Sequence, residues 1–452
     1  MWRKRFFSAR RLYSALPVRS PTTSTATFRH FETTYPAVAT LADAFTAPSS
    51  SRRPRRVVFQ SMTASGGCLL ADGNVDTDDG GRDTARVLRR ILASMIRLQA
   101  FDETFKAAQR QGKLSFFLES RGEEAAVVAS AAALEPADDI FSQYREHGAL
   151  LWRGASFEAL AHQCCGSRED SAKGRQMPVH YGDRGRNFHT VSSPLATQLL
   201  HAVGFAYAKT FTPMPQASMP QPSIGDQRPI VACYFGDGTA SEGDFHAALN
   251  FASTLRCPVV FICRNNGYAI STPTTEQYAG DGIVSRAEGY GMASCRVDGG
   301  DARAVFLATR EARQQALATG RPVLLELMTY RLGDHSTSDD RRNYVPKSRL
   351  DQGERDGDPI KRLARFLSAT DAEQLAIREE AVLEARRAID VAQRTPRPDV
   401  RTMFDDAYDP AFASYEQSRQ RRDLLLGGGG DADADADDGS GLERGDEAET
   451  RE

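Results

Sequence analysis

Three short apolar runs alternate with helix-like segments, and this alternation constrains the fold more than any other feature of the chain. The runs cover residues 230–235, 258–263 and 323–329, and turn or polar residues bound each of them. Helix-like segments lie between them at 242–255 and 302–318. Fully apolar strands that alternate with helices are typical of a parallel sheet with both faces buried. The chain is therefore predicted to be an α/β protein whose parallel sheet is covered by helices on both faces.

Further helices are expected on both sides of these runs. Between Arg86 and Gln111, apolar residues recur at the spacing of one helix face. Residues 122–134 are rich in Ala, and residues 376–394 form an amphipathic pattern with mixed charge. We expect ordered structure to begin near Val57.

The two ends of the chain differ in composition from its centre. The first 31 residues contain seven Arg or Lys and no acid, within a Ser-, Thr- and Pro-rich stretch that extends to residue 56. This composition favours a transit peptide and linker over residues 1–56, with a disordered basic tail as the alternative. Residues 427–452 form an acidic, low-complexity tail that is predicted to be disordered. The domain between them is expected at 57–426, with a Pro-rich insert at 210–229.

Composition excludes several classes of function. The formal net charge is −3, and the acidic tail alone carries ten acids and two bases from Asp431 to Glu452. No basic stripe interleaved with aromatic residues appears, so a nucleic-acid partner is not expected. No apolar run approaches the roughly 18 residues of a membrane span, so no membrane partner is expected either. The seven cysteines include no C-x-x-C pair and indicate free thiols in a reducing compartment.

A Gly-Asp-Gly turn follows the apolar run 230–235. Ligands of open parallel sheets bind at the carboxyl ends of strands, so Asp237 stands where a ligand would be bound. The motif is a weak dinucleotide fingerprint, because Ser241 stands where G-x-G-x-x-G requires its last Gly. Two interpretations of Asp237 are open: a metal or phosphate ligand, and the N-cap of the next helix. Glu242 and Asp244 are expected only to stabilise the first turns of that helix through its dipole.

The next strand along the chain also ends in polar side chains. Arg264, Asn265 and Asn266 follow the second apolar run, with 26 residues between Gly238 and Asn265. The carboxylate of Asp237 and the amide oxygen of Asn266 would therefore meet at one edge of the sheet. Mg²⁺ takes such hard oxygen ligands and keeps phosphate oxygens and water in its other positions. Arg264 would add a cation that binds a diphosphate. The alternative is that the Asn265–Asn266 pair only caps the end of the strand and binds no metal.

A G-D-G motif followed at this distance by N-N resembles the signature of thiamine-diphosphate enzymes. The likeness extends from about Val57 to about Asp405 and is closest to the alpha subunits of branched-chain 2-oxo acid dehydrogenases, their decarboxylating component. The motifs that carry it are GKLSFFLESRGEEAAVVASAAAL (112–134), FSQYREHGALLWRG (141–154), KGRQMPVHYG (173–182), TVSSPLATQ (190–198), RNNGYAISTPTTEQY (264–278) and TYRLGDHSTSDD (329–340).

The resemblance implies a set of site residues. Mg²⁺ would be bound by Asp237, Asn266 and the backbone carbonyl of Tyr268. Potassium would be bound by Ser192, Pro194, Thr197 and Gln198. Thiamine diphosphate would be bound by Tyr144, Arg145, Ser193, Leu195, Gly238, Thr239, Arg264 and His335. His335 would also be catalytic, and so would Gln143, which would lie near the reacting centre.

Plainer roles remain open for several of these side chains. Arg145 next to a packed Tyr could be a surface residue, and the Ser-Ser-Pro segment before a helix could only cap it. His335 lies in a polar loop after a strand, where a His is more often functional than structural. For His147 and His180, packing or hydrogen bonding is the better interpretation.

The resemblance also implies a reaction, a location and partners. The reaction would be oxidative decarboxylation of branched-chain 2-oxo acids in Leu, Ile and Val catabolism, with transfer of the acyl group to a lipoyl group in the mitochondrial matrix. In this family a separate pyrimidine-binding domain activates the cofactor, and roughly 350 ordered residues leave no room for it here. We therefore expect a beta subunit in an alpha-two-beta-two heterotetramer that works with a lipoyl-bearing acyltransferase core.

A regulatory site follows from the same likeness. Ser336 matches the position at which a kinase inactivates members of the family, so that a kinase and a phosphatase would be further partners. The family's second serine in this loop falls at Pro346.

Two other functions fit the motifs less well. An alpha subunit of pyruvate or acetoin dehydrogenase would share the fold, but RQMPVHYG, SEGD and HSTSDD favour the branched-chain enzyme. A non-catalytic regulatory subunit is disfavoured because Asp237, Asn266, Arg145 and His335 are all present.

Overall fold

The protein is described by a computed structural model that covers residues 27–30, 33–38, 41–45, 58–63, 81–211, 229–404 and 413–425. It contains two compact units, residues 1–397 and 398–452, and the first holds the sheet and the candidate site. In the second unit the structure describes η6 (Val400–Phe404) and α13 (Ala413–Leu425). Three predicted segments lie wholly or mainly outside the described residues: the transit peptide, the Pro-rich insert and the acidic tail.

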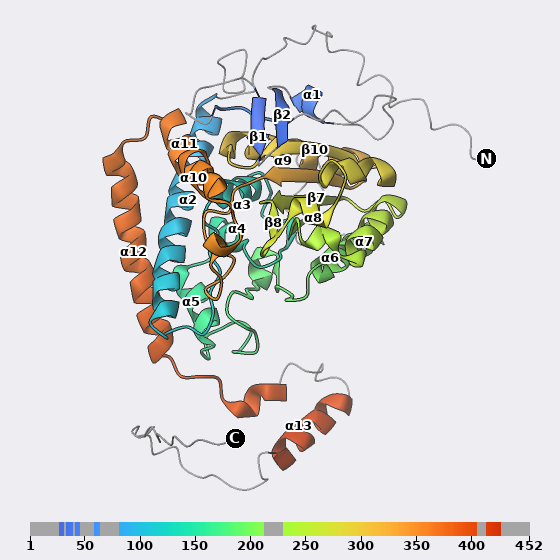
Figure 1. Cartoon of the computed structure of the whole chain (residues 1–452). Coiled ribbons are helices and arrows are strands. Elements are labelled where there is room, and N and C mark those ends of the chain that lie inside the picture. Colours follow the sequence, from blue (N-terminus) through green and yellow to red (C-terminus); the bar gives the residue numbers. More distant parts are fainter. Residues whose placement is uncertain are drawn as a thin grey trace, which may run out of the picture. The chain divides into compact units, whose positions relative to one another are not determined.

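A nine-stranded sheet organises the first unit (Figure 1). Among the described strands, its neighbours all run parallel except β1 and β2, which pair antiparallel. Its order is β1 (Thr27–His30), β2 (Thr33–Val38), β3 (Val58–Phe59), β10 (Ala293–Asp298), β11 (Val323–Met328), β7 (Val259–Asn265), β6 (Val231–Gly236), β4 (Asp139–Phe141) and β5 (Phe188–His189).

Both faces of the sheet are buried, because alternate residues of each central strand enter different cores. On β6, Ala232 and Tyr234 join one apolar cluster, and Cys233 and Phe235 join the other. The helices whose buried residues join the first cluster are α1 (Leu41–Ala44), α2 (Gly81–Arg110), α3 (Glu124–Ala132), α4 (His147–Trp152), α5 (Phe157–Cys165), α9 (Ala302–Thr319), α11 (Pro359–Phe366) and α12 (Asp371–Arg394). The helices of the second cluster are α6 (Thr197–Phe211) and α7 (Gly243–Thr254), with the 3-10 helices η3 (Thr239–Ser241) and η4 (Val284–Tyr290). The predicted fold class is thus confirmed.

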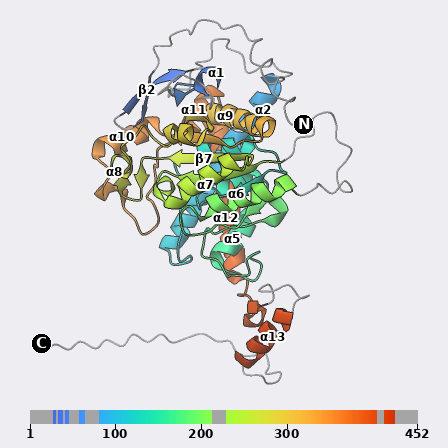
Figure 2. The same cartoon turned by 90° about the vertical axis from the view of Figure 1, so that its right-hand side faces the viewer.

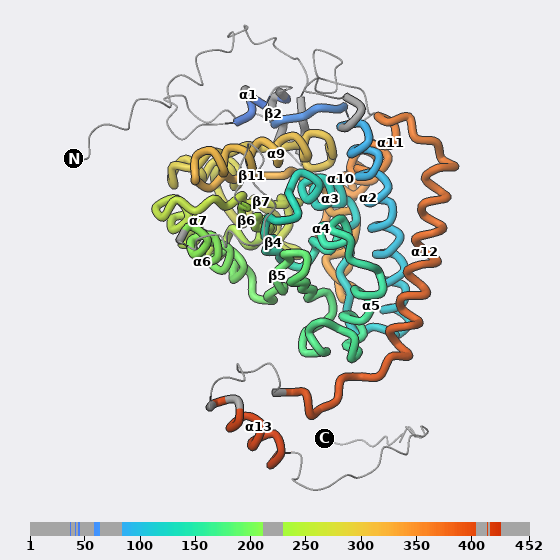
Figure 3. The backbone as a smooth tube through the Cα atoms, turned by 180° about the vertical axis from the view of Figure 1, so that it is seen from behind, coloured from blue at the N-terminus to red at the C-terminus, as the bar shows by residue number. Residues whose placement is uncertain are grey.

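The helical layers are visible in the other views. Helix α12 runs along α2, and α6 lies beside α7 on the other side of the sheet (Figure 2, Figure 3). The remaining described elements are α8 (Thr274–Gln277), α10 (Lys347–Asp356), η2 (Arg184–Arg186), η5 (Arg341–Asn343) and the hairpin of β8 (Tyr268–Ala269) and β9 (Thr272–Pro273). None of the described helices is long and apolar enough to cross a membrane.

The predicted strands and helices are confirmed to within a few residues, but the start of the ordered region was wrong. Elements β1, β2 and α1 all precede Val57. Strand β2 adds to the sheet by pairing with β3, Ala37 opposite Val58. Such pairing is a long-range contact, whereas composition reports only local preference, so a basic, Ser- and Thr-rich stretch did not indicate it.

Gly122 is a position where only glycine fits the backbone. Its φ is +91°, and an added Cβ would lie 2.2 Å from the backbone oxygen of Tyr330. We expect Gly122→Ala to destabilise the protein by about 2–5 kcal/mol, through left-handed strain and overpacking. Urea unfolding monitored by circular dichroism measures this. Gly204→Ala is the control, since Gly204 is an exposed residue of α6 with open space around it and Ala favours a helix. Equal unfolding midpoints for the two variants would contradict the prediction.

Candidate cofactor and metal site at the carboxyl ends of the strands

The ends of β6, β7 and β11 lie side by side at one edge of the sheet. Gly236 is opposite Arg264 in the β6–β7 pair, and Asn265 is opposite Met328 in the β7–β11 pair. The residues that follow these strands, Asp237 and Asn266 among them, therefore emerge together, as the sequence predicts.

Asp237 is buried, with 2% of its surface exposed, and does not cap a helix. Gly238 is the N-cap of η3 and Glu242 that of α7, so the N-cap interpretation of Asp237 was wrong. Its Oδ2 accepts a hydrogen bond of 2.8 Å from Gln277 Nε2. Burial raises the pKa of Asp237 to about 6. A bound cation would offset this desolvation, so a metal fits the position. Asp244 is exposed in the first turn of α7, as predicted.

The Asn pair divides into two roles. Asn266 Nδ2 donates to Glu123 Oε1 at 3.3 Å, and Asn266 Oδ1 accepts from the backbone N–H of Tyr268 at 3.2 Å. Asn265 instead donates to Glu326 Oε1 at 2.8 Å and to the hydroxyl of Tyr278 at 3.1 Å, which fixes the loop behind the strand. Asn265 is thus engaged with the loop behind the strand, whereas Asn266 contacts Glu123 and Tyr268 at the strand ends.

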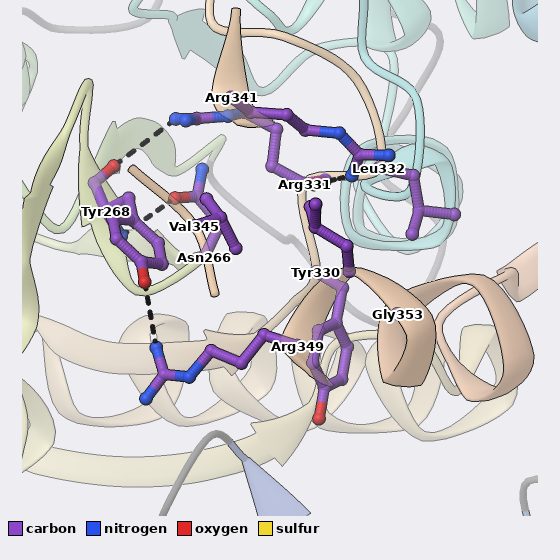
Figure 4. Close-up of a pocket in the computed structure, with 10 residues that line it drawn as sticks. Asn266, Tyr268, Tyr330, Arg331, Leu332, Arg341, Val345, Arg349 and Gly353 are labelled. Carbon is purple, nitrogen blue, oxygen red and sulfur yellow. Dashed lines mark hydrogen bonds between the residues drawn. The ribbon is translucent and has the colours of Figure 1, made fainter. Parts of the chain in front are cut away.

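Two arginines contact Tyr268, one at its backbone oxygen and one at its side-chain hydroxyl (Figure 4). Arg331 Nη1 donates to the backbone oxygen of Tyr268 at 3.4 Å, and Arg349 Nη1 donates to its hydroxyl at 3.2 Å. A pocket beside this loop is lined by Asn266 and Tyr268 and by three arginines, Arg331, Arg341 and Arg349. The cations give this end of the sheet the electrostatic character that an anionic cofactor needs.

Arg264 is engaged in a buried ion-pair cluster that the sequence did not reveal. Its Nε donates to Glu146 Oε1 at 2.6 Å, and its Nη1 donates to Glu123 Oε1 at 3.0 Å. All three side chains are buried. Burial lowers the pKa of Arg264, but Glu146 and Glu123 outweigh it and raise that pKa above its ordinary value. A guanidinium carries five N–H donors, so donors remain for a diphosphate after these contacts.

Tyr144, Arg145 and His335 come together from β4's end and the loop after β11. Arg145 Nη1 donates to the backbone oxygen of Glu119 at 2.6 Å, and its Nη2 donates to that of His335. The hydroxyl of Tyr144 lies 3.4 Å from His335 Nε2. Burial, followed by the charges of Arg145 and Arg331, lowers the pKa of His335 to about 3. The imidazole is thus neutral near pH 7, and Arg145 is a buried part of this group, not a surface residue.

Gln143 joins this group to the Gly-Asp-Gly turn. Its Oε1 accepts hydrogen bonds from the backbone N–H of Gly236 at 2.9 Å and from Thr239 Oγ1 at 2.7 Å. Gly238 packs closely, since an added Cβ would lie 2.8 Å from the Cβ of Ala269. Through these hydrogen bonds Gln143 stabilises the turn that contains Asp237.

The segment 190–198 is fixed by two different side chains. His180 Nδ1 lies 3.1 Å from the backbone oxygen of Pro178, so Nδ1 carries a proton, and His180 Nε2 contacts Ser193 Oγ. This hydrogen-bonding role of His180 agrees with the prediction. Gln198 Nε2 donates to the backbone oxygen of Tyr234 at 3.2 Å, while its buried Oε1 has no partner among the described residues. Ser192, Pro194 and Leu195 precede α6, and Thr197 is its first residue.

His147 is paired in the core. Its Nε2 lies 2.6 Å from Asp102 Oδ1, which confirms the hydrogen-bonding interpretation. Among the described residues, no group of three or more His, Cys, Asp or Glu side chains could hold a metal. A site of one carboxylate, one amide oxygen and one backbone oxygen is of a different kind and suits Mg²⁺.

Comparisons with known proteins agree with this geometry. Residues 93–401 match the family described as Dehydrogenase E1 component. The chain belongs to this family. It is 45% identical over 341 residues to the protein named 2-oxoisovalerate dehydrogenase subunit alpha, mitochondrial, of Homo sapiens, covering 74% of each chain. The Caenorhabditis elegans protein of the same name is 46% identical over 325 residues, covering 71% of this chain and 72% of that one.

Proposed function

We propose that this chain is the alpha subunit of a branched-chain 2-oxo acid dehydrogenase that uses thiamine diphosphate and Mg²⁺. The observation that carries the proposal is the convergence of Asp237, Asn266 and Tyr268 at one sheet edge, beside the buried Arg145 and the half-buried His335. The names of the relatives support the substrate class, 2-oxoisovalerate and similar acids.

The residues present fit the cofactor and its metal. Asp237, Asn266 and the carbonyl of Tyr268 would hold Mg²⁺, and Ser193 and Leu195 would face the aminopyrimidine through their backbone. The diphosphate would meet Tyr144, Arg145, Arg264 and His335 and the amides of Gly238 and Thr239 at the start of η3. When bound, thiamine diphosphate supplies the electron sink that decarboxylation of a 2-oxo acid requires.

The side chains of this protein would orient the cofactor and neutralise the charge of its diphosphate. Arg145 would supply positive charge to the diphosphate in a buried place, where such charge acts strongly, and Arg264, paired with Glu146 and Glu123, would contribute its remaining N–H donors. His335 can exchange a hydrogen bond with a phosphate or substrate oxygen. Gln143 fixes the Gly-Asp-Gly turn, so its removal would displace Asp237.

We further propose a potassium ion near Gln198. The unpartnered, buried Oε1 of Gln198 supports this, together with Ser192, Pro194 and Thr197 on the same segment. The wild-type protein should melt at a higher temperature in KCl than in NaCl, a difference equivalent to about 1–3 kcal/mol. Gln198→Leu should remove the difference, because Leu offers no oxygen. A melting temperature of the wild type that is the same in both salts would contradict this proposal.

The remaining partners are proposed from the family. The chain would be imported into the mitochondrial matrix, assemble with a beta subunit as an alpha-two-beta-two heterotetramer, and pass its acyl product to a lipoyl-bearing acyltransferase. A kinase and a phosphatase would act on Ser336.

Modification at Ser336 should block the site. Ser336 is half-buried next to His335, and its Oγ accepts from the backbone N–H of Ser338 at 3.2 Å. Ser336→Glu should lower the activity of the heterotetramer at least about tenfold, because a carboxylate there repels the diphosphate and breaks this loop contact. Ser338→Glu, at an exposed position of the same loop, is the control. Full activity of Ser336→Glu would oppose the idea.

Co-expression with a candidate beta subunit tests the function as a whole. The heterotetramer should decarboxylate 4-methyl-2-oxopentanoate faster than pyruvate, and the isolated chain should decarboxylate neither. A preference for pyruvate would indicate a pyruvate dehydrogenase subunit. An inactive but well-folded heterotetramer would indicate a regulatory subunit, and activity of the chain alone would refute the requirement for a beta subunit.

A further inference from the structure

Glu123 is a buried acid to which the proposed site assigns no role. It is the N-cap residue of α3, yet its side chain makes no capping hydrogen bond with that helix. It is completely buried, with 0% of its surface exposed. A carboxylate turned away from its own helix and out of water must serve contacts elsewhere, since burying it otherwise is costly.

One oxygen of Glu123 gathers three donors from two strand ends. Oε1 accepts from Arg264 Nη1 at 3.0 Å, from Asn266 Nδ2 at 3.3 Å and from Thr329 Oγ1 at 3.2 Å. Because an ionised carboxylate only accepts, the amide N–H₂ of Asn266 must face Glu123 and its Oδ1 must face away. Glu123 and the backbone N–H of Tyr268 thus together fix the orientation of the Asn266 amide, with Glu123 holding its N–H₂ end.

The other oxygen of Glu123 has nothing to accept from. Oε2 is buried and has no hydrogen-bond partner among the described residues. An ionised oxygen left without a donor inside a protein costs more than one that is merely exposed. Its position on the side chain that orients Asn266 places it at the same strand ends as Asp237 and Tyr268.

We propose that Glu123 is a positioning residue of the metal site, which orients Asn266 through Oε1 and accepts a hydrogen bond from a Mg²⁺-bound water through Oε2. Mg²⁺ retains several waters in proteins, and such waters need acceptors. Groups that orient metal ligands typically change metal affinity tenfold to a hundredfold when they are removed. This inference rests on the function proposed above.

Two neighbouring glutamates give a matched test. Glu124 is also completely buried, but it accepts from the backbone N–H of Gly122 at 2.7 Å and from Gln99 Nε2 at 3.5 Å, and it makes no described hydrogen bond to Arg264, Asn266 or Thr329. Glu123→Gln and Glu124→Gln make the same substitution one residue apart. Glu123→Gln leaves a neutral acceptor for Asn266 and places an N–H₂ group where the water would donate.

The experiment uses electron paramagnetic resonance to measure the affinity of Mn²⁺ for the heterotetramer in the presence of thiamine diphosphate. Glu123→Gln should weaken Mn²⁺ binding about tenfold to a hundredfold, and Glu124→Gln should change it less than about threefold. Excess Mg²⁺ should restore part of the activity of Glu123→Gln, which a general loss of structure would not allow. Melting temperatures of both variants report on folding.

Each other outcome has a defined meaning. Wild-type Mn²⁺ affinity in Glu123→Gln, or equal losses in both variants, overturns the inference and leaves the proposed function intact. If Glu123→Gln fails to assemble, Glu123→Asp replaces it, because the charge that Arg264 requires is kept while the carboxylate is withdrawn; unchanged affinity in that variant also overturns the inference. Absence of Mn²⁺ binding by the wild type refutes the proposed function itself.

Discussion

Asn266→Ala should lower the decarboxylase activity of the heterotetramer by about two orders of magnitude or more and should abolish tight binding of Mg²⁺. The variant removes the amide oxygen that completes the predicted ligand set with Asp237 and the carbonyl of Tyr268. It also removes the donor to Glu123 Oε1. Loss of a metal ligand should lower metal affinity and activity more than the tenfold to hundredfold loss that is typical when a residue hydrogen-bonded to a ligand is removed. Steady-state rates against Mg²⁺ concentration measure the effect.

Asn265→Ala is the matched control for this change. Asn265 is the adjacent residue of the same type, and its donors go to Glu326 and Tyr278, away from the predicted metal. That variant should lose stability while keeping the Mg²⁺ dependence of the wild type. If Asn266→Ala keeps a wild-type Mg²⁺ dependence, or if Asn265→Ala loses it, the assignment of the metal ligand is wrong.

Arg264→Met should cost about 3–5 kcal/mol of folding stability in addition to activity. Arg264 pairs with Glu146 and Glu123, and all three are buried. Removing the cation leaves two buried carboxylates without compensation, which is the costly way to break a buried ion pair. Urea unfolding of the chain provides the free energy.

A surface pair supplies the comparison for Arg264→Met. Arg342 contacts Asp340 at 2.8 Å, but 78% of the Arg342 side chain is exposed. Arg342→Met should leave the unfolding midpoint unchanged, because water and salt screen exposed pairs. Similar midpoints for the two variants would show that the Arg264 cluster contributes no more than a surface contact.

The sequence was sufficient for the strand ends but not for what surrounds them. Asp237 and Asn266 were predictable because strand, turn and spacing are local patterns, and parallel strands bring their carboxyl ends to one edge. Tyr144, Arg145 and His335, in contrast, were predicted as cofactor ligands from the family resemblance. Their contact across the sheet edge depends on how the loop after β11 returns to the end of β4.

Buried charge pairing was the part that no local pattern could indicate. Arg264 and Glu146 are 118 residues apart in the sequence, and no local pattern around either residue predicts their contact. Glu123 and Glu124 are adjacent in a segment for which the sequence predicted a helix and a family resemblance but no role for either acid, although the two acids contact different partners. The short edge strands β1 and β2 were missed for the same reason, since their place depends on a distant partner.

Titration of the heterotetramer with thiamine diphosphate by calorimetry, in Mg²⁺ and in a chelator, tests the central claim most directly. The account predicts saturable binding in Mg²⁺ at one site for each alpha chain, weakened at least about tenfold when the divalent cation is removed. Binding that is equally tight in the chelator, or no binding in Mg²⁺, would contradict the claim that Asp237, Asn266 and Tyr268 hold a metal-bridged diphosphate.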